Sequence, residues 1–582
     1  MESQESQKIA DAVLGHLTFL YDAKTAQTAF DKLIGIIADF REETPELRQR
    51  RMNVSEKDVI LITYGDQFQS PGCLPLQVFA DTAHRYFNPM INSIHLLPFY
   101  PYSSDDGFSV VDYTAVNPRF GSWEDIQALR KGFRLMFDAV VNHISVRSRW
   151  FRGFLDGDPR YSDYFIALDP GTDLRSVTRP RTHPLLTPFQ TSNGLKHVWT
   201  TFSSDQVDLN FKNPNVLLDV IRVLLRYVKE GAEFIRLDAI GYLWKTVGTS
   251  CIHLPETHQI VQLFRSVLDW VAPHVILITE TNVPHAENIS YFGDGANEAQ
   301  MVYNFALPPL ILHTLLTGNA DVLSQWASEL ELPGKRTTFF NFTASHDGLG
   351  VMPAKGLLND AEIQFLVDKT LAHDGFVNYK TNSDGSQSPY ELNITLFDAL
   401  SNPTGDEPAS LKIDRFMASQ AMMLALAGIP GIYVHSLIGS SNNLAGVAET
   451  GQNRSINREK WQQSEFEKRL ANPNSIASQV FQRYRRLLKI RSKHPAFHPH
   501  GAQQIVLGNQ AVFAVLRMSP SGDETILCLH NVTTDSQIFN VDSKLINTGG
   551  KFQDLLTKRL FASSKINLGP YQTCWLRTNS ES

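Results

Sequence analysis

The stretch FIRLDAIGY, residues 234–242, places one arginine and one aspartate inside an otherwise apolar run of strand-forming residues. Burying an ionised carboxylate is costly unless that carboxylate is paired or hydrogen-bonded. Two interpretations are open from this stretch alone. Arg236 and Asp238 form a structural ion pair, or Asp238 marks the mouth of an active site.

The stretch belongs to one of eight short apolar runs that alternate with helical patterns. The runs are DVILITYGDQF (58–68), INSIHLLPFYP (91–101), FRLMFDAVVNH (133–143), AEFIRLDAIGY (232–242), HVILITETN (274–282), MVYNFALPP (301–309), TTFFNFTASHDG (337–348) and GIPGIYVHS (428–436). Continuous apolar runs of this kind predict strands of a parallel sheet that is buried on both faces. The amphipathic stretches 215–231 and 256–271 predict helices between them. Eight alternations predict a (β/α)8 TIM barrel.

The rest of the chain predicts additions to this barrel. Helical patterns fill residues 1–56, and the barrel region is expected over 57–496. Two gaps are too long for simple crossovers, and we expect inserted subdomains at 144–213, after the third strand, and at 349–407, after the seventh. Loops of this length usually have functional roles, often as lids. Short alternating runs with turn signals predict a C-terminal antiparallel β domain over 497–582.

The composition argues against several classes of protein. The chain has 582 residues, 42% of them hydrophobic and 19% charged, which is typical of a soluble globular enzyme. A net charge of -7 without a dense basic block argues against nucleic acid as a partner. The four cysteines are scattered, so neither a disulfide framework nor a structural zinc site is expected.

The sequence also carries signals about location. No apolar run approaches the roughly 20 residues that span a bilayer, and the first residues lack the pattern of a secretory signal. We therefore expect a cytoplasmic protein with no membrane partner. The oligomeric state, including a homodimer, stays open.

Polar residues follow several of the predicted strands. In a barrel of this kind the active site lies at the C-terminal ends of the strands. The residues there are Asp138, Asn142 and His143 on the third, Arg236 and Asp238 on the fourth, Glu280 on the fifth, and His346 and Asp347 on the seventh. Each alone could be a cap, a turn or a packing residue. Several carboxylates in one cleft repel one another, and this favours a catalytic role for the set.

Paired carboxylates predict glycosyl transfer. One carboxylate attacks the anomeric carbon while the other protonates the leaving oxygen, and the second then activates the acceptor. Asp238, held ionised by Arg236, would be the nucleophile. Glu280 follows the apolar HVILIT (274–279), where desolvation would raise its pKa toward that of a general acid.

Four short motifs extend this interpretation to a family. DAVVNH (138–143), RLDAIG (236–241), ITETN (278–282) and FTASHDG (342–348) resemble the signature regions of the α-amylase superfamily, in the same order. The resemblance covers the barrel and the β domain. It implies that Asp238 is the nucleophile, Glu280 the general acid/base and Asp347 a third carboxylate that orients sugar hydroxyls. It also implies that Arg236, His143 and His346 bind the glucosyl unit.

Further segments resemble the sucrose phosphorylase subfamily. They are SSDDGFSVVDY (103–113), GTSC (248–251) and QNRSINR (452–458). This resemblance implies that Asp105 holds sugar hydroxyls, that Phe108 supplies an apolar platform, and that Arg454 lies at the glucose subsite. HLPETHQI (253–260), ITETNVPHAENISYFGDG (278–295) and the N-terminal helical region depart from sucrose phosphorylases and resemble glucosylglycerate phosphorylases more closely.

The resemblance implies a retaining glycoside phosphorylase that transfers α-glucose from 2-O-α-glucosylglycerate to inorganic phosphate. The alternatives are a phosphorylase of sucrose or another small glucoside, a hydrolase or transglucosidase, and an inactive amylase-like binding protein. The sequence shows no Gly-rich phosphate loop, so cationic side chains are the candidates for phosphate binding, namely Arg454, Arg147 and His285.

The expected ligands are the glucoside and phosphate, with no further cofactor. Asn142 matches a position that helps to bind structural calcium in many amylases. Residues 144–213 show no calcium-binding loop, and phosphorylase relatives work without the ion, so no metal is expected.

Overall fold

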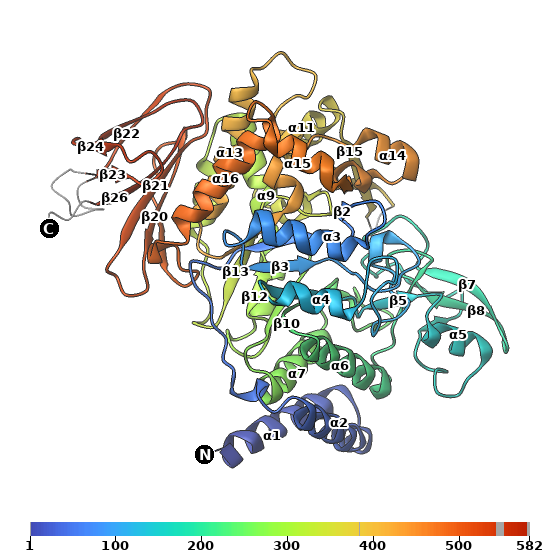
Figure 1. The fold of residues 1–582 in the computed structure, drawn as a ribbon. Helices are drawn as coiled ribbons and strands as arrows, with labels where there is room; N and C mark the ends of the chain where they lie inside the picture. The colour runs from blue at the N-terminus through green and yellow to red at the C-terminus, as the bar shows by residue number, and fades with distance from the viewer. Residues whose placement is uncertain (1, 383–384, 543–551, 579–582) are drawn as a thin grey trace.

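A closed parallel barrel lies at the centre of the computed structural model, which describes residues 2–382, 385–542 and 552–578 (Figure 1). Its strands are β1 (Ile60–Thr63), β3 (Ser93–Leu96), β4 (Arg134–Ala139), β10 (Ala232–Leu237), β11 (Ile276–Thr279), β12 (Met301–Tyr303), β13 (Thr338–Phe342) and β17 (Ile429–Tyr433). They follow chain order around the barrel, and β17 closes it against β1. Each strand lies in one of the eight predicted runs, so the predicted (β/α)8 barrel is confirmed.

Strand β10 carries the stretch on which the fold prediction rests. Phe234, Ile235 and Leu237 are fully buried, as expected for a strand covered on both faces. The parallel register pairs Arg236 with Asp138 on β4. Two charged residues are therefore held side by side in the barrel wall, next to the point where β10 ends.

Helices lie between the barrel strands along the chain. They are α3 (Pro75–Thr82), α4 (Trp123–Arg130), α6 (Pro214–Lys229), α7 (Pro255–Val271), α8 (His285–Ile289), α9 (Leu307–Thr317), α10 (Asp321–Ser328) and α13 (Ala409–Ala425), and α14 (Leu444–Thr450), α15 (Gln463–Ala471) and α16 (Ile476–Arg491) follow β17. Helix α6 begins with Pro214 after the cap Asn213, whose side chain accepts a hydrogen bond from the Asn215 N–H. The predicted helices 215–231 and 256–271 correspond to α6 and α7.

Two N-terminal helices, α1 (Glu2–Leu20) and α2 (Ala23–Glu43), lie beside α7 and α6 (Figure 1). Asp22 separates them and caps α2 by accepting from the N–H groups of Lys24 and Thr25. The buried face of α2 consists of Ala26, Ala29, Leu33, Ile36, Ile37 and Phe40. The pair adds a helical layer to the outside of the barrel, and it contains none of the predicted site residues.

Both long gaps contain secondary structure of their own. Residues 144–213 hold α5 (Arg149–Asp156) and β6 (Ala167–Leu168), β7 (Leu186–Thr191) and β8 (Gly194–Trp199), while β5 (His143–Ser145) pairs with β9 (Gln206–Asp208). Residues 349–407 hold β14 (Leu349–Gly350), α11 (Asp360–Ala372), β15 (Phe376–Thr381), β16 (Gln387–Asn393) and α12 (Leu396–Leu400). A short parallel pair, β2 (Phe68–Gln69) and β18 (Trp461–Gln462), joins two further loops. The exact domain boundaries stay a prediction.

The C-terminal region is an antiparallel β domain, as predicted, and lies to one side of the barrel (Figure 1). One sheet has the order β19 (Ala502–Ile505), β20 (Val512–Met518), β21 (Thr525–Asn531), β26 (Thr573–Thr578), β23 (Phe552–Asp554) and β24 (Leu560–Phe561), and β22 (Gln537–Asn540) pairs with β25 (Lys565–Leu568). The buried Arg517 donates a hydrogen bond of 2.9 Å to the carbonyl of Ala425 and so ties this domain to α13. Over the described ranges, no helix has both the length and the apolar character needed to cross a membrane.

Candidate active site

A pocket lies where the barrel strands end, and it gathers charged side chains from several of them. All nine residues predicted for catalysis and for binding the glucosyl unit line this pocket, namely Asp105, Phe108, His143, Arg236, Asp238, Glu280, His346, Asp347 and Arg454. The lining also includes Arg181, Phe202, Gln206, Tyr242, Asn282, Tyr390 and Glu391, which sequence reasoning did not select. The structure therefore brings the predicted residues together, and it adds others from the two long insertions.

Arg236 is the buried centre of the carboxylate cluster. Its Nη1 donates a hydrogen bond of 2.8 Å to Asp238 and forms an ion pair with Asp138, while Nη2 lies 3.6 Å from Glu280 Oε2. The second oxygen of Asp138 lies 2.6 Å from His95 Nε2. Because one guanidinium reaches three carboxylates, the Arg236–Asp238 ion pair is part of the carboxylate cluster in the pocket. The two interpretations of FIRLDAIGY, a structural ion pair and an active-site aspartate, are therefore compatible.

The backbone directly after Asp238 is unusual. Ala239 has φ +50° and ψ +34°, in the left-handed region that residues with a Cβ atom seldom adopt. This conformation lets the Ala239 N–H donate a hydrogen bond of 3.0 Å to Glu280 Oε2. Backbone strain at such a position marks sites where geometry is held for a purpose, and here it brings the end of β10 to Glu280.

Burial raises the pKa of both Asp238 and Glu280, and the Arg236 cation offsets only part of this effect. The rise for Glu280 agrees with the prediction from its apolar surroundings. The sequence predicts that Arg236 favours the ionised form of Asp238, and the Arg236 cation does lower this pKa. Burial raises it by more, and the depth of burial cannot be read from the sequence. The negative charge of Glu280 raises the pKa of Asp238 further, so the two carboxyl groups titrate as a coupled pair.

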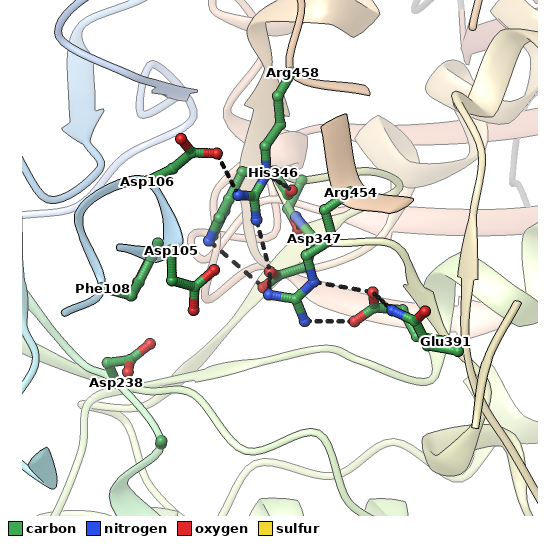
Figure 2. A network of polar contacts seen from close by, with 12 residues as sticks. Asp105, Asp106, Phe108, Asp238, His346, Asp347, Glu391, Arg454 and Arg458 are labelled. Atoms are coloured by element: carbon green, nitrogen blue, oxygen red, sulfur yellow. Dashed lines mark hydrogen bonds and ion pairs between the residues drawn. The ribbon is translucent and has the colours of Figure 1, made fainter. Parts of the chain in front are cut away.

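Asp347 belongs to a row of alternating carboxylates and guanidinium groups (Figure 2). Its Oδ1 lies 2.5 Å from Arg454 Nη1 and 3.6 Å from Arg458 Nη2. Arg454 also binds Glu391 through two nitrogens, and Arg458 donates to Asp106 at 2.6 Å. The row joins the loop after β3, the segment after β13, strand β16 and the turn Asn453–Asn457 into one wall of the pocket.

The ionisation of Asp347 differs from that of the other two carboxyl groups. Burial raises the pKa of Asp347, but the surrounding arginines, with Arg454 and Arg458 contributing most, together lower it by more. The net effect places the pKa below the ordinary value for an aspartate. Asp347 is therefore anionic at neutral pH, while Asp238 and Glu280 hold a proton more readily.

An aromatic surface lies beside these charges. The rings of Phe108 and His346 are stacked, with centroids 4.9 Å apart and an interplanar angle of 3°. His143 Nε2 and the Gln206 amide both lie within hydrogen-bond distance of the Phe108 carbonyl, at 3.0 and 3.1 Å. Burial lowers the pKa of His143 and His346, so both rings are neutral at pH 7. A flat apolar face beside neutral donors suits a sugar ring.

Arg181 brings a different kind of charge to the lining. It comes from the insertion after β4, and its guanidinium carbon lies 5.5 Å from the Tyr390 ring and 5.9 Å from the Phe202 ring. Arg236 and Arg454 are each paired with carboxylates. No ion pair joins Arg181 to a carboxylate of the described residues, so its charge is available to an anionic ligand.

Two predicted phosphate candidates lie outside the pocket lining. Arg147 borders a separate surface groove together with Arg149 and Asp112. His285 packs against Trp326 and Phe339, with ring centroids 5.8 and 6.3 Å away, and burial lowers its pKa. Neither side chain is brought to the carboxylates, and the prediction for these two residues is wrong.

The residues around Asn142 do not fit a calcium ion. The Lys245 ammonium donates 2.8 Å to Asn142 Oδ1 and lies 2.6 Å from Asp208 Oδ2, and Lys245 and Asp208 are both buried. The position between the two oxygens is thus already held by a cation of this chain. Within the described part of the chain, no group of three or more His, Cys, Asp or Glu residues could hold a metal ion.

Sequence reasoning missed Glu391 and Arg181 because both lie in the long insertions, away from the strand ends. Arg458 and Asp106 belong to the motifs QNRSINR and SSDDGFSVVDY, but the resemblance implies no role for either. Asp105 and Asp106 adopt left-handed backbone conformations, with φ +53° and +48°. The sequence DDG is typical of a turn but does not by itself predict these conformations.

The chain is similar to known proteins over nearly its whole length. Residues 86–333 match the family described as alpha amylase, catalytic domain. The glucosylglycerate phosphorylase of Allomeiothermus silvanus is 50% identical over 99% of this chain and 100% of its own length. The sucrose phosphorylase of Agrobacterium vitis is more distant, at 30% identity over 76% of this chain and 89% of its own.

The fold also matches a solved structure. The sucrose 6F-phosphate phosphorylase from Thermoanaerobacter thermosaccharolyticum aligns with a TM-score of 0.71, covering 83% of this chain and 95% of the other, at 24% identity. At this identity the likeness concerns the fold alone. The full-length match to a relative at 50% identity is the finding that bears on the family.

Proposed function

This chain belongs to the glucosylglycerate phosphorylase family, whose barrel is of the alpha amylase type, and on that premise we propose how its pocket performs the reaction. It is an enzyme, a glycoside phosphorylase. Its proposed substrates are 2-O-α-glucosylglycerate and inorganic phosphate, and its products are α-glucose 1-phosphate and glycerate. The observation that carries this proposal is the pocket with Asp238, Glu280 and Asp347 in a chain that is 50% identical over its whole length to a relative of that name.

In the first half-reaction, Asp238 attacks the anomeric carbon of the glucosyl unit. The bond to the glycerate oxygen breaks, and Glu280 gives its proton to that oxygen, so glycerate leaves as an alcohol. The coupled pair supplies one proton and one negative charge, as this step needs. The direct hydrogen bond from Arg236 to Asp238, at 2.8 Å against 3.6 Å to Glu280, favours the negative charge on Asp238.

In the second half-reaction, phosphate takes the place of glycerate. Glu280 now accepts a proton from the phosphate oxygen that attacks the anomeric carbon, and the bond to Asp238 breaks. Two inversions give net retention, so the product is the α-phosphate. The pocket must favour phosphate over water here, and an unpaired cation near the carboxylates serves that purpose.

The glucosyl unit is proposed to lie against Phe108 and His346, with Asp347 accepting from its hydroxyl groups. Asp105, His143 and Arg454 complete its surroundings. Asp347 is anionic because the surrounding arginines outweigh burial, and a fixed anion stabilises the positive charge that develops on the ring in the transition state.

Arg181 is proposed to hold the anion on the other side of the reacting bond. The leaving glycerate carries a carboxylate and the incoming acceptor is phosphate, so one guanidinium serves both half-reactions. Arg181 lines the pocket and has no carboxylate partner among the described residues, whereas Arg454 is already bound to Glu391 and Asp347. This assignment replaces the candidates Arg147 and His285 that the sequence suggested. No cofactor is part of the proposal, since phosphate is a co-substrate, and the proposed location of the enzyme is the cytoplasm.

The test is a substrate panel with and without phosphate. We expect phosphate-dependent α-glucose 1-phosphate release from 2-O-α-glucosylglycerate, at a higher kcat/KM than from sucrose or glucosylglycerol. A preference for sucrose would contradict the proposed acceptor. Release of free glucose at the same rate without phosphate would identify a hydrolase and reject phosphorolysis.

A further inference from the structure

Glu391 is a fourth carboxylate of the pocket and fixes the position of Arg454. It lies on β16, is 1% exposed, and accepts hydrogen bonds of 3.0 Å from Arg454 Nε and 2.6 Å from Arg454 Nη2. A two-point contact of this kind sets the plane of a guanidinium as well as its position. The remaining nitrogen, Nη1, then faces Asp347 at 2.5 Å (Figure 2).

Neighbouring amides hold Glu391 in this geometry. Asn378 on β15 donates to Glu391 Oε1 at 3.4 Å, and Asn453, beside Arg454, donates to Asn378 Oδ1 at 2.8 Å. The carboxylate is thus positioned from the insertion after β13, and it acts on an arginine from a different loop. Its contact with the candidate catalytic carboxylate Asp347 runs through Arg454.

The charges along this wall leave a negative excess. The row runs Asp106, Arg458, Asp347, Arg454 and Glu391, so two guanidinium groups lie between three carboxylates (Figure 2). Both cations are neutralised from two sides. An anion gains little by approaching this wall, although it contains two arginines.

We propose, resting on the function proposed above, that Glu391 is a positioning and specificity residue of this pocket. Its carboxylate aims Arg454 at Asp347, and its charge keeps the glucosyl end of the pocket closed to phosphate and glycerate. These anions bind beside Arg181 instead, because Arg181 has no ion-pair partner among the described carboxylates. Without the charge on Glu391, Arg454 becomes a second anion site, and phosphate competes with the sugar.

Glu391→Gln tests this with little change of shape. A Gln side chain can accept from Arg454 with only one of its two terminal atoms, so the plane of the guanidinium is no longer fixed. We expect kcat/KM for the glucoside to fall by about tenfold or more, as for a lost charge-assisted contact. We also expect inorganic sulfate to become a competitive inhibitor against α-glucosyl fluoride, a donor that has no carboxylate for Arg181. In the wild type, sulfate is expected to compete with phosphate and not with this donor.

Glu407→Gln is the matched control. Glu407 binds Arg415 through both carboxylate oxygens, as Glu391 binds Arg454, but this pair does not line the pocket. The control is expected to keep the wild-type kcat/KM and the wild-type sulfate pattern. Thermal unfolding of both variants shows whether a fall in kcat/KM comes from loss of structure or from displacement of the Arg454 guanidinium.

A double substitution tests whether Glu391 acts through Arg454. If Glu391 acts through Arg454, then Glu391→Gln adds little to the loss caused by Arg454→Met, and independent, multiplying losses would overturn the proposal. A folded Glu391→Gln variant with wild-type kcat/KM and sulfate inhibition would also overturn it. Should that variant not fold, Glu391→Asp keeps the charge, and it must lower kcat/KM without sulfate competing against α-glucosyl fluoride.

The proposed function can be rejected independently of the Glu391 inference. A wild-type protein that cleaves the glucoside without phosphate would reject phosphorolysis. The Glu391 inference would then be decided by the same variants, from the hydrolytic kcat/KM and from sulfate competition against α-glucosyl fluoride.

Discussion

Replacing Arg181 by methionine removes the guanidinium that we assign to the anionic groups of glycerate and phosphate. The guanidinium carbon lies 5.5 Å from the Tyr390 ring, so the aliphatic methionine side chain can still pack at that position while the charge is lost. The ion pair between Asp347 and Arg454 at the sugar end of the pocket does not involve Arg181 and is kept. The change therefore separates binding of the anion from binding of glucose.

The magnitude follows from the surroundings of Arg181. A hydrogen bond to a charged group contributes about 1.5–3 kcal/mol, and Arg181 is half-buried, so solvent screening reduces its share. We expect a loss of about 1.4–2 kcal/mol, or roughly 10–30-fold in kcat/KM for phosphate.

The assay is initial-rate kinetics of α-glucose 1-phosphate formation at varied phosphate and saturating glucoside. The reverse reaction, at varied glycerate, should show a loss of similar size, because one guanidinium serves both anions. Arg147→Met is the control, since Arg147 lies on the same insertion but not in the pocket lining. If Arg181→Met changes kcat/KM for phosphate by less than about twofold, or if Arg147→Met causes the larger loss, the assignment is refuted.

Three further outcomes are expected. Lys245→Met leaves the buried Asp208 without its cation, and removing one partner of a buried ion pair costs about 3–5 kcal/mol of folding stability. Because Asp208 keeps hydrogen bonds from Thr201 and Asn142, we expect a loss at the lower end of this range, measured by urea unfolding. An unchanged unfolding midpoint would contradict this. The pH profile of kcat/KM should be bell-shaped. Because burial raises the pKa of Asp238 and Glu280, the acidic limb of this profile should lie above the ordinary carboxyl pKa of about 4. Full activity down to that pH would argue against the raised pKa values. Asp238→Asn should lower turnover by several orders of magnitude with the fold retained, and wild-type turnover would reject its role as nucleophile.

The sequence predicted the barrel well because its signal is repeated along the chain. Eight apolar runs, each followed by a helical pattern, allow few other architectures. The run ends were less accurate: MVYNFALPP reads as one strand, but β12 ends at Tyr303 and α9 starts at Leu307, with Pro308 and Pro309 in the first helical turn. Proline is well suited to that position and poorly suited to the interior of a strand.

The candidate site was predicted where its residues follow strands and missed where they lie in the insertions. Asp238, Glu280 and Asp347 come directly after buried runs, so their convergence follows from the topology. Glu391 and Arg181 are placed by long loops whose path has no periodic signal. The net rise in the pKa of Asp238 was missed for a related reason, since burial is a property of the whole barrel and cannot be read from its neighbour Arg236.

Trapping the glucosyl-enzyme tests the central claim most directly. With Glu280→Gln, an activated donor such as α-glucosyl fluoride needs no general acid, and the intermediate accumulates because phosphate is no longer activated. The account predicts one glucosyl unit attached to the peptide that contains FIRLDAIGY, on Asp238, and its loss when Asp238 is also replaced by asparagine. A glucosyl unit on another carboxylate, or turnover of the donor with no adduct at all, would contradict it.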